Sequence, residues 1–123
     1  LSATEEVLEQ MESSLDAQKL TEWANDNYPK YNIFGPLAFD NAVSKDAAKI
    51  KGISNPVAGN ANIIIVPNIE TGNALVKLMV NFMNATAGGF VVGGKVPVVI
   101  TSRSDTIESR LSSISNAILS INK

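Results

Sequence analysis

An apolar run that ends in polar residues at the start of a helical pattern is the feature that most constrains the fold of this chain. Residues 96–100 have the β-branched composition of a strand, and apolar residues recur at helical spacing from Ile107 onward. A strand that leads through a short loop into a helix is the basic unit of layered α/β folds. We therefore expect an α/β architecture.

Other segments alternate in the same way between strand and helix patterns. Residues 61–66 are almost continuously apolar, as is typical of a strand covered on both faces, and residues 31–34 suggest a shorter strand. Helices are expected at about 16–27, 40–50 and 71–83. This order predicts a three-layer α/β/α fold with a mostly parallel mixed sheet, in which residues 63–65 are buried. The last helix should bury one apolar stripe, formed by Ile107, Leu111, Ile114, Ile118 and Ile121.

The loop before the last helix offers hydroxyl groups and one cation at the end of the expected strand. Strand ends in such sheets open onto ligand crevices, and a helix N-terminus carries unpaired N–H groups. Ser102 supplies a donor and Arg103 a planar charged fork, which together suit phosphate or a developing oxyanion. The same residue types are also common in turns and caps. Asp105 and Glu108 have the spacing of a capping pair. We therefore expect Asp105 to be the N-cap of this helix, and its alternative role is that of a catalytic base.

The composition excludes several classes of chemistry. The 123 residues suit one domain, and a net charge of −2 with scattered basic residues offers no polycationic face for nucleic acid or an anionic membrane. Without histidine or cysteine there is no imidazole base, no thiolate and no usual zinc ligand set. Ser102 is therefore expected to donate a hydrogen bond instead of acting as a nucleophile. No apolar run approaches a membrane span, so we expect a cytoplasmic protein.

Four segments together resemble one family. The chain resembles phosphate acetyltransferases and phosphate butyryltransferases in order and approximate spacing, and the first segment is the most similar to the butyryltransferases. These segments are Gly-Pro-Leu-Ala-Phe-Asp-Asn-Ala-Val-Ser at 35–44, Asn-Pro-Val-Ala-Gly at 55–59, Pro-Asn-Ile-Glu-Thr-Gly-Asn at 67–73 and Pro-Val-Val-Ile-Thr-Ser-Arg at 97–103.

The resemblance implies an acyl transfer reaction. It implies that acyl-CoA and phosphate give acyl phosphate and CoA, with coenzyme A and phosphate as substrates, no metal and no further cofactor. It also implies a fold related to isocitrate and isopropylmalate dehydrogenases, and a homodimer. Residues 1–123 would be the C-terminal portion of such an enzyme, inactive alone. By this resemblance Ser102 and Arg103 lie at the interdomain cleft, while neither Asp105 nor Glu108 falls at the spacing of the family's proposed thiol base.

Candidate contacts to coenzyme A lie in two places. Gly72 and Asn73 are expected where a strand ends and a helix begins, so their amides are candidates to contact phosphate or the diphosphate of CoA. The start of a helix alone also explains them. Ser104 is the third candidate. An alternative function is a noncatalytic interaction or regulatory module derived from the family, and the apolar residues on two sides of the helix at 71–83 favour a subunit interface.

Overall fold

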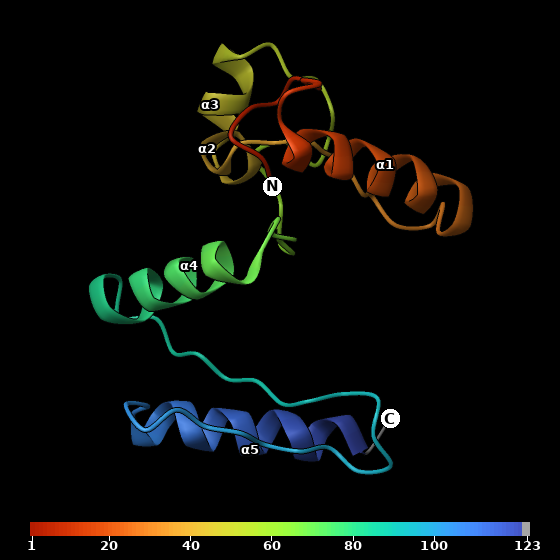
Figure 1. Ribbon diagram of the computed structural model, residues 1–123. Helices are drawn as coiled ribbons and strands as arrows, with labels where there is room; N and C mark the ends of the chain where they lie inside the picture. The colour runs from red at the N-terminus through yellow and green to blue at the C-terminus, as the bar shows by residue number, and fades with distance from the viewer. Residues whose placement is uncertain (122–123) are drawn as a thin grey trace. The chain divides into compact units, whose positions relative to one another are not determined.

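The computed structural model describes residues 1–121, and its regular structure is helical (Figure 1). The chain divides into two compact units, Leu1–Thr71 and the residues from Gly72 onward, and each is described by itself. The helices are α1 (Glu12–Asn27), α2 (Phe39–Val43), α3 (Lys45–Ile50), α4 (Ile69–Phe82) and α5 (Ile107–Ile121). All four regions expected to be helical contain a helix, and the region at 40–50 contains two.

The prediction of a three-layer α/β/α fold with a mostly parallel sheet is wrong for residues 1–121. Their extended pairing is limited to one isolated antiparallel bridge between Val91 and Val98. Ile63 and Ile65 were expected to be buried, yet they are 78% and 60% exposed. β-Branched residues favour the extended backbone, but a strand also needs a neighbouring backbone along its length. Among the described residues, 61–66 meet other backbone only through single hydrogen bonds, from Ala61 to Ala42 and from Leu1 to Ile65, and not along their length.

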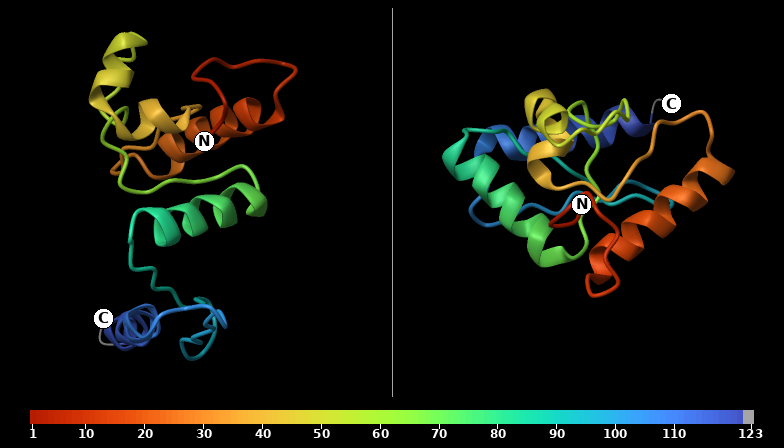
Figure 2. Two further views of the ribbon diagram at one scale, coloured as in Figure 1. Left: turned by 90° about the vertical axis from the view of Figure 1, so that its left-hand side faces the viewer. Right: turned by 90° about the horizontal axis from the view of Figure 1, so that it is seen from above.

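The core of the first unit is built mainly from small residues. Leu37, Ala42, Ala48 and Ala58 form its buried centre. Because alanine side chains are short, α2 and α3 pack directly against each other, as both views of Figure 2 show. Larger apolar residues complete the cluster at its partly exposed edge, namely Leu1, Phe34, Ile53, Val57 and Ala61.

Helix ends in the first unit follow local sequence signals. The Ser44 hydroxyl accepts a hydrogen bond from the Ala47 N–H at 3.3 Å and so caps α3. Gly52 follows the C-cap of α3 with a φ of 69°, the left-handed conformation in which glycine commonly ends a helix. The helix α1 differs, because it begins at Glu12 without a side-chain cap, one turn before the expected start at Asp16.

The second unit buries the small face of α5. Ser109, Ser113 and Ala117 are its buried residues, whereas the apolar stripe expected to be buried is exposed, with Ile107 at 72% and Ile121 at 66%. The backbone near residue 88 approaches this small face closely. A Cβ atom at Gly88 would lie 2.4 Å from the Ser112 hydroxyl. The expected burial of the stripe is therefore wrong, since short side chains let the backbone pack on the other face.

Candidate functional site

Ser102 and Asp105 hold a tight turn immediately before α5. The Ser102 carbonyl accepts a hydrogen bond from the Asp105 N–H at 3.2 Å, and the Asp105 carboxylate accepts one from the Ser102 N–H at 2.6 Å. The second bond is charge-assisted, which makes it the stronger of the two. The hydroxyls of Ser102 and Ser104 lie 3.1 Å apart. The structure thus brings Ser102, Ser104 and Asp105 together in one turn.

Thr106, and not Asp105, caps α5. The Thr106 hydroxyl accepts a hydrogen bond from the Ser109 N–H at 3.2 Å, and the Thr106 carbonyl accepts the Arg110 N–H at 3.1 Å. These are the contacts of an N-cap residue, so the expected capping pair of Asp105 and Glu108 is wrong. Sequence reasoning missed Thr106, although a threonine directly before the first apolar helical residue is a signal for this position.

Arg103 lies at the exposed side of the turn. Its side chain makes no hydrogen bond or salt bridge within residues 1–121, so its guanidinium donors are free. The Arg110 guanidinium lies nearby and donates to the Arg103 carbonyl at 3.4 Å. Arg110 thus reaches back from the first turn of α5 to the loop that carries Arg103, at a helix start whose unpaired N–H groups carry partial positive charge. This arrangement suits an anion such as phosphate.

Gly72 and Asn73 do not open a helix. Asn68 caps α4, because its side-chain oxygen accepts hydrogen bonds from the Thr71 N–H at 2.9 Å and the Thr71 hydroxyl at 2.7 Å. Gly72 and Asn73 follow in the second turn of α4, past the free N–H groups. In the described part of the chain, no hydrogen bond joins them to the turn at 102–105. Their expected position at the start of the helix is wrong.

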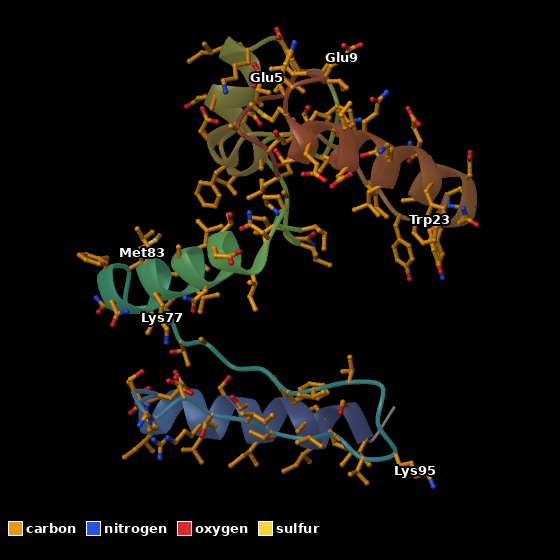
Figure 3. The ribbon with its side chains drawn as sticks, viewed as in Figure 1. Glu5, Glu9, Trp23, Lys77, Met83 and Lys95 are labelled. Carbon is orange, nitrogen blue, oxygen red and sulfur yellow. The ribbon has the colours of Figure 1, made fainter. Side chains whose placement is uncertain are left out.

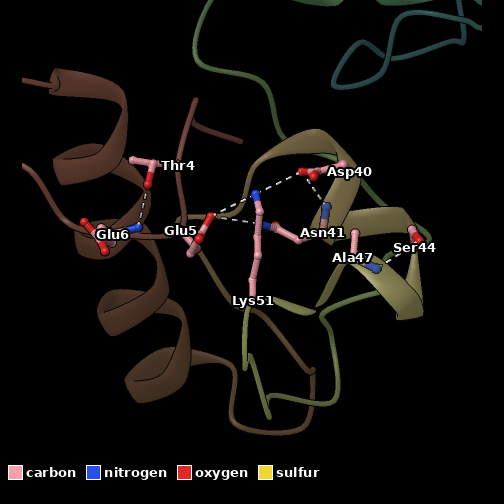
Figure 4. Close-up of polar contacts among 8 residues, drawn as sticks. All are labelled: Thr4, Glu5, Glu6, Asp40, Asn41, Ser44, Ala47 and Lys51. Carbon is pink, nitrogen blue, oxygen red and sulfur yellow. Dashed lines mark hydrogen bonds and ion pairs between the residues drawn. The ribbon is translucent and has the colours of Figure 1, made fainter. Parts of the chain in front are cut away.

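A charged cluster in the first unit was not predicted (Figure 4). The Lys51 ammonium lies 3.2 Å from the Glu5 carboxylate and 3.3 Å from the Asp40 carboxylate. The Asn41 amide donates to the same Glu5 oxygen at 2.9 Å, and the Asn41 side chain is fully buried. Glu5 is 46 residues from Lys51 along the chain, so no local spacing signals this cluster. It ties the first residues to α2 and the end of α3.

The cluster shifts the pKa values of its members. A hydrogen bond from its own backbone N–H, followed by the Lys51 ammonium, lowers the pKa of the Glu5 carboxyl. The Asn41 N–H, followed by Lys51, lowers the pKa of Asp40. Partial desolvation opposes the charge on Lys51, yet the hydrogen bonds to Glu5 and Asp40 together raise its pKa. The cluster is therefore a set of mutually stabilised charges without an activated base.

Two further observations limit the chemistry that residues 1–121 offer. They contain no group of three or more acidic, histidine or cysteine side chains placed to hold a metal ion. None of their helices combines the length and the apolar character that crossing a bilayer requires. Exposed aromatic and charged side chains, such as Trp23 on α1, Lys77 on α4 and Lys95 in the loop before α5, point outward (Figure 3).

The chain is similar to known proteins of one family. The family model described as phosphate acetyl/butaryl transferase matches residues 1–118. The chain belongs to this family. The phosphate acetyltransferase of Rhizobium meliloti is 44% identical over 120 residues, which cover 97% of this chain and 38% of that protein. The probable phosphate butyryltransferase of Bacillus subtilis is 44% identical over 119 residues, which cover 96% of this chain and 40% of that protein.

One solved structure has a backbone similar to that of this chain. It is the crystal structure of a branched-chain phosphotransacylase from Enterococcus faecalis V583, with a TM-score of 0.86 and 44% sequence identity to this chain. The similar region covers 95% of this chain and 42% of that chain. The family resemblance inferred from the four segments is confirmed. The chain spans 38% to 42% of the length of these three relatives.

Proposed function

We propose that this sequence supplies one wall of the active-site cleft of a phosphate acyltransferase, which converts acyl-CoA and inorganic phosphate to acyl phosphate and CoA. Family membership supports the reaction class. The observation that carries the assignment to this region is the turn at 102–105. It presents the free Arg103 guanidinium and the Ser102 hydroxyl beside the start of α5. We propose that coenzyme A and phosphate are the substrates and that the protein uses no metal or further cofactor.

The proposed roles follow from where charge develops. When a phosphate oxygen attacks the thioester carbonyl, the carbonyl oxygen becomes negative, and the CoA sulfur then leaves with the bonding electrons. Arg103 holds phosphate or the developing oxyanion with its fixed pair of donors. Ser102 adds one hydroxyl donor. The free guanidinium of Arg103 and the exposed Ser102 hydroxyl support these roles.

Asp105 has two candidate roles, and we assign it the positioning one. One carboxylate oxygen already accepts the Ser102 N–H, so Asp105 fixes the turn that carries Arg103. Asp105→Asn separates the two roles, because the amide oxygen keeps an acceptor for that N–H but the residue can no longer take a proton. We expect Asp105→Asn to retain most of kcat. A loss of about 100-fold or more with a changed pH profile would assign it as the CoA thiol base.

The decisive experiment measures phosphate-dependent CoA release in a full-length family member that carries this sequence. Arg103→Ala should lower kcat/KM by about 100-fold or more, because a preorganised donor to negative charge is lost. Arg103→Lys should recover only part, since a point charge does not replace the bidentate fork. Lys95→Ala removes another exposed cation and is the matched control. Near-normal kcat/KM in Arg103→Ala would refute the proposed role and favour a noncatalytic interaction module.

Contacts to CoA are tested by the same assay. Ser104 lies in the turn and stays a proposed CoA contact, so Ser104→Ala should raise KM for CoA with little change in kcat. Gly72 and Asn73 also stay proposed CoA contacts, now from a position inside α4 and not at its start. Unchanged KM in both Ser104→Ala and Asn73→Ala would place the CoA site elsewhere.

We propose that the complete enzyme is cytoplasmic and acts as a homodimer that uses α4. No residue of α4 is buried within the described chain, and Ile69 and Phe82 are 82% and 83% exposed. Such large apolar residues on one helix favour a partner surface. Sedimentation should give a dimer that Phe82→Asp weakens. A monomer at micromolar concentration would contradict this arrangement.

A further inference from the structure

The side chain of Arg110 connects the first turn of α5 with the loop before it. The Arg110 backbone N–H donates to the Thr106 carbonyl at 3.1 Å, so the helix fixes the position of the residue. One guanidinium N–H reaches back across seven residues and donates to the Arg103 carbonyl at 3.4 Å. Arg110 therefore holds a backbone group of the turn at 102–105 from a regular element of the structure.

The peptide group that Arg110 contacts is also held at its other end. The Arg103 carbonyl and the Ser104 N–H belong to one peptide group, and this N–H donates to the Ser102 hydroxyl at 3.4 Å. Because a peptide group is planar, a contact at its carbonyl also fixes the direction of its N–H. The contact from Arg110 thus reaches the Ser102 hydroxyl through a single peptide group.

This arrangement leaves the proton of the Ser102 hydroxyl available. A serine hydroxyl has one proton to donate and two lone pairs with which to accept. The Ser104 N–H occupies one lone pair, and the Ser104 hydroxyl, 3.1 Å away, is close enough to donate to the other. When donors fill both lone pairs, the Ser102 proton is left for an acceptor outside the turn, such as a phosphate oxygen.

Arg110 also brings a positive charge to this chain of hydrogen bonds. Both salt bridges within residues 1–121 involve Lys51, so no carboxylate pairs with Arg110 in that part of the chain. The Asp105 carboxylate instead accepts the Ser102 N–H at 2.6 Å. Hydrogen bonds in a chain polarise one another, so a guanidinium at the carbonyl strengthens the donors that follow it, including the Ser102 hydroxyl.

We propose, on the basis of the function proposed for the turn at 102–105, that Arg110 is a positioning residue of the active site. It fixes the peptide group between Arg103 and Ser104, and through this group it orients the Ser102 hydroxyl toward phosphate or the developing oxyanion. Arg110 itself does not contact the substrate. Its effect should therefore require the Ser102 hydroxyl, whereas a cation that bound phosphate directly would act without that hydroxyl.

The test is a double-mutant cycle that measures phosphate-dependent CoA release in a full-length family member carrying this sequence. Arg110→Met keeps a long side chain with good helix propensity but removes the donors and the charge. It should lower kcat/KM for phosphate by about tenfold, the order of one hydrogen bond to a charged group. In a Ser102→Ala background the same change should cost less than about twofold, because the hydroxyl that it orients is gone. Arg110→Lys keeps a charged donor and should recover most of the loss.

Lys95→Met removes an exposed cation elsewhere in the second unit and is the matched control, with unchanged kcat/KM. The urea midpoint of Arg110→Met should equal that of the wild type, because Arg110 is exposed. A lowered midpoint without recovery in Arg110→Lys would assign the loss to folding and overturn the proposal. An equal loss in both backgrounds would overturn it as well, since Arg110 would then act independently of Ser102.

Arg103→Ala, measured in parallel, separates this proposal from the function on which it is based. A loss in Arg103→Ala together with wild-type kcat/KM in Arg110→Met would overturn the role of Arg110 alone. Near-normal kcat/KM in Arg103→Ala would refute the function proposed for the turn, and the role of Arg110 with it.

Discussion

Replacing Gly59 with alanine should destabilise the first unit far more than the same change at Gly52. Both glycines have positive φ values, 76° and 69°. A Cβ atom at Gly59 would lie 2.6 Å from the Lys45 Cα, whereas one at Gly52 would meet nothing within 4 Å. The left-handed backbone costs an alanine about 1 to 2 kcal/mol, and reduced freedom of the unfolded chain offsets roughly half of that. We therefore expect Gly52→Ala to cost about 1 kcal/mol.

At Gly59 the contact with backbone adds a second cost. Lys45 begins α3 and its Cα has no rotamer that moves away, so overpacking adds about 1 to 3 kcal/mol and the total is about 2 to 4 kcal/mol. The Gly59 N–H also donates to the Asn41 carbonyl at 2.8 Å, and any shift that relieves the contact strains this bond. Urea unfolding followed by the single tryptophan, Trp23, measures both variants. Equal losses at Gly59 and Gly52 would refute the steric argument.

Two further predictions concern charge and capping. The pKa values of Glu5 and Asp40 are lowered in the folded chain, so the unfolded chain binds protons more readily. The unfolding free energy should therefore fall as the pH drops below about 4.5, the ordinary pKa of Glu5. Lys51→Met should weaken this dependence, and identical urea midpoints from pH 7 to 3 in both proteins would contradict it. Thr106→Ala should cost α5 about 1 kcal/mol, measured by amide exchange in its first turn, while Thr106→Ser costs little. A larger loss in Asp105→Ala than in Thr106→Ala would contradict the cap assignment.

Local signals in the sequence predicted the helices and several of their ends. The serine at 44 and the glycine at 52 act through contacts with residues three or four positions away, so their roles could be inferred without the fold. The turn that carries Ser102 and Arg103 was likewise expected before the last helix. Its cap was misplaced by one residue, because Asp105 and Thr106 are both good N-cap types and only the geometry distinguishes them.

Burial and strand pairing could not be inferred in the same way. The period of apolar residues in α5 identified a stripe, but the neighbouring backbone packs on Ser109, Ser113 and Ala117 instead. Isoleucines at 63 and 65 favoured a strand, yet pairing depends on segments far away in the chain. The contacts of Lys51 with Glu5 and Asp40 could not be predicted either, because each joins residues that share no local sequence pattern.

The contacts of Leu1 and Glu5 with later residues also determine when these two residues can dock during synthesis on the ribosome. Glu5 needs Asn41, 36 residues later, and Leu1 needs Ile65, 64 residues later. Residues 1–5 therefore have no place to dock until the residues up to Ile65 have been translated. A helix such as α1 can form within its own sixteen residues in the meantime. Residues 1–5 thus leave the ribosome before α1 but find their permanent contacts after it has formed.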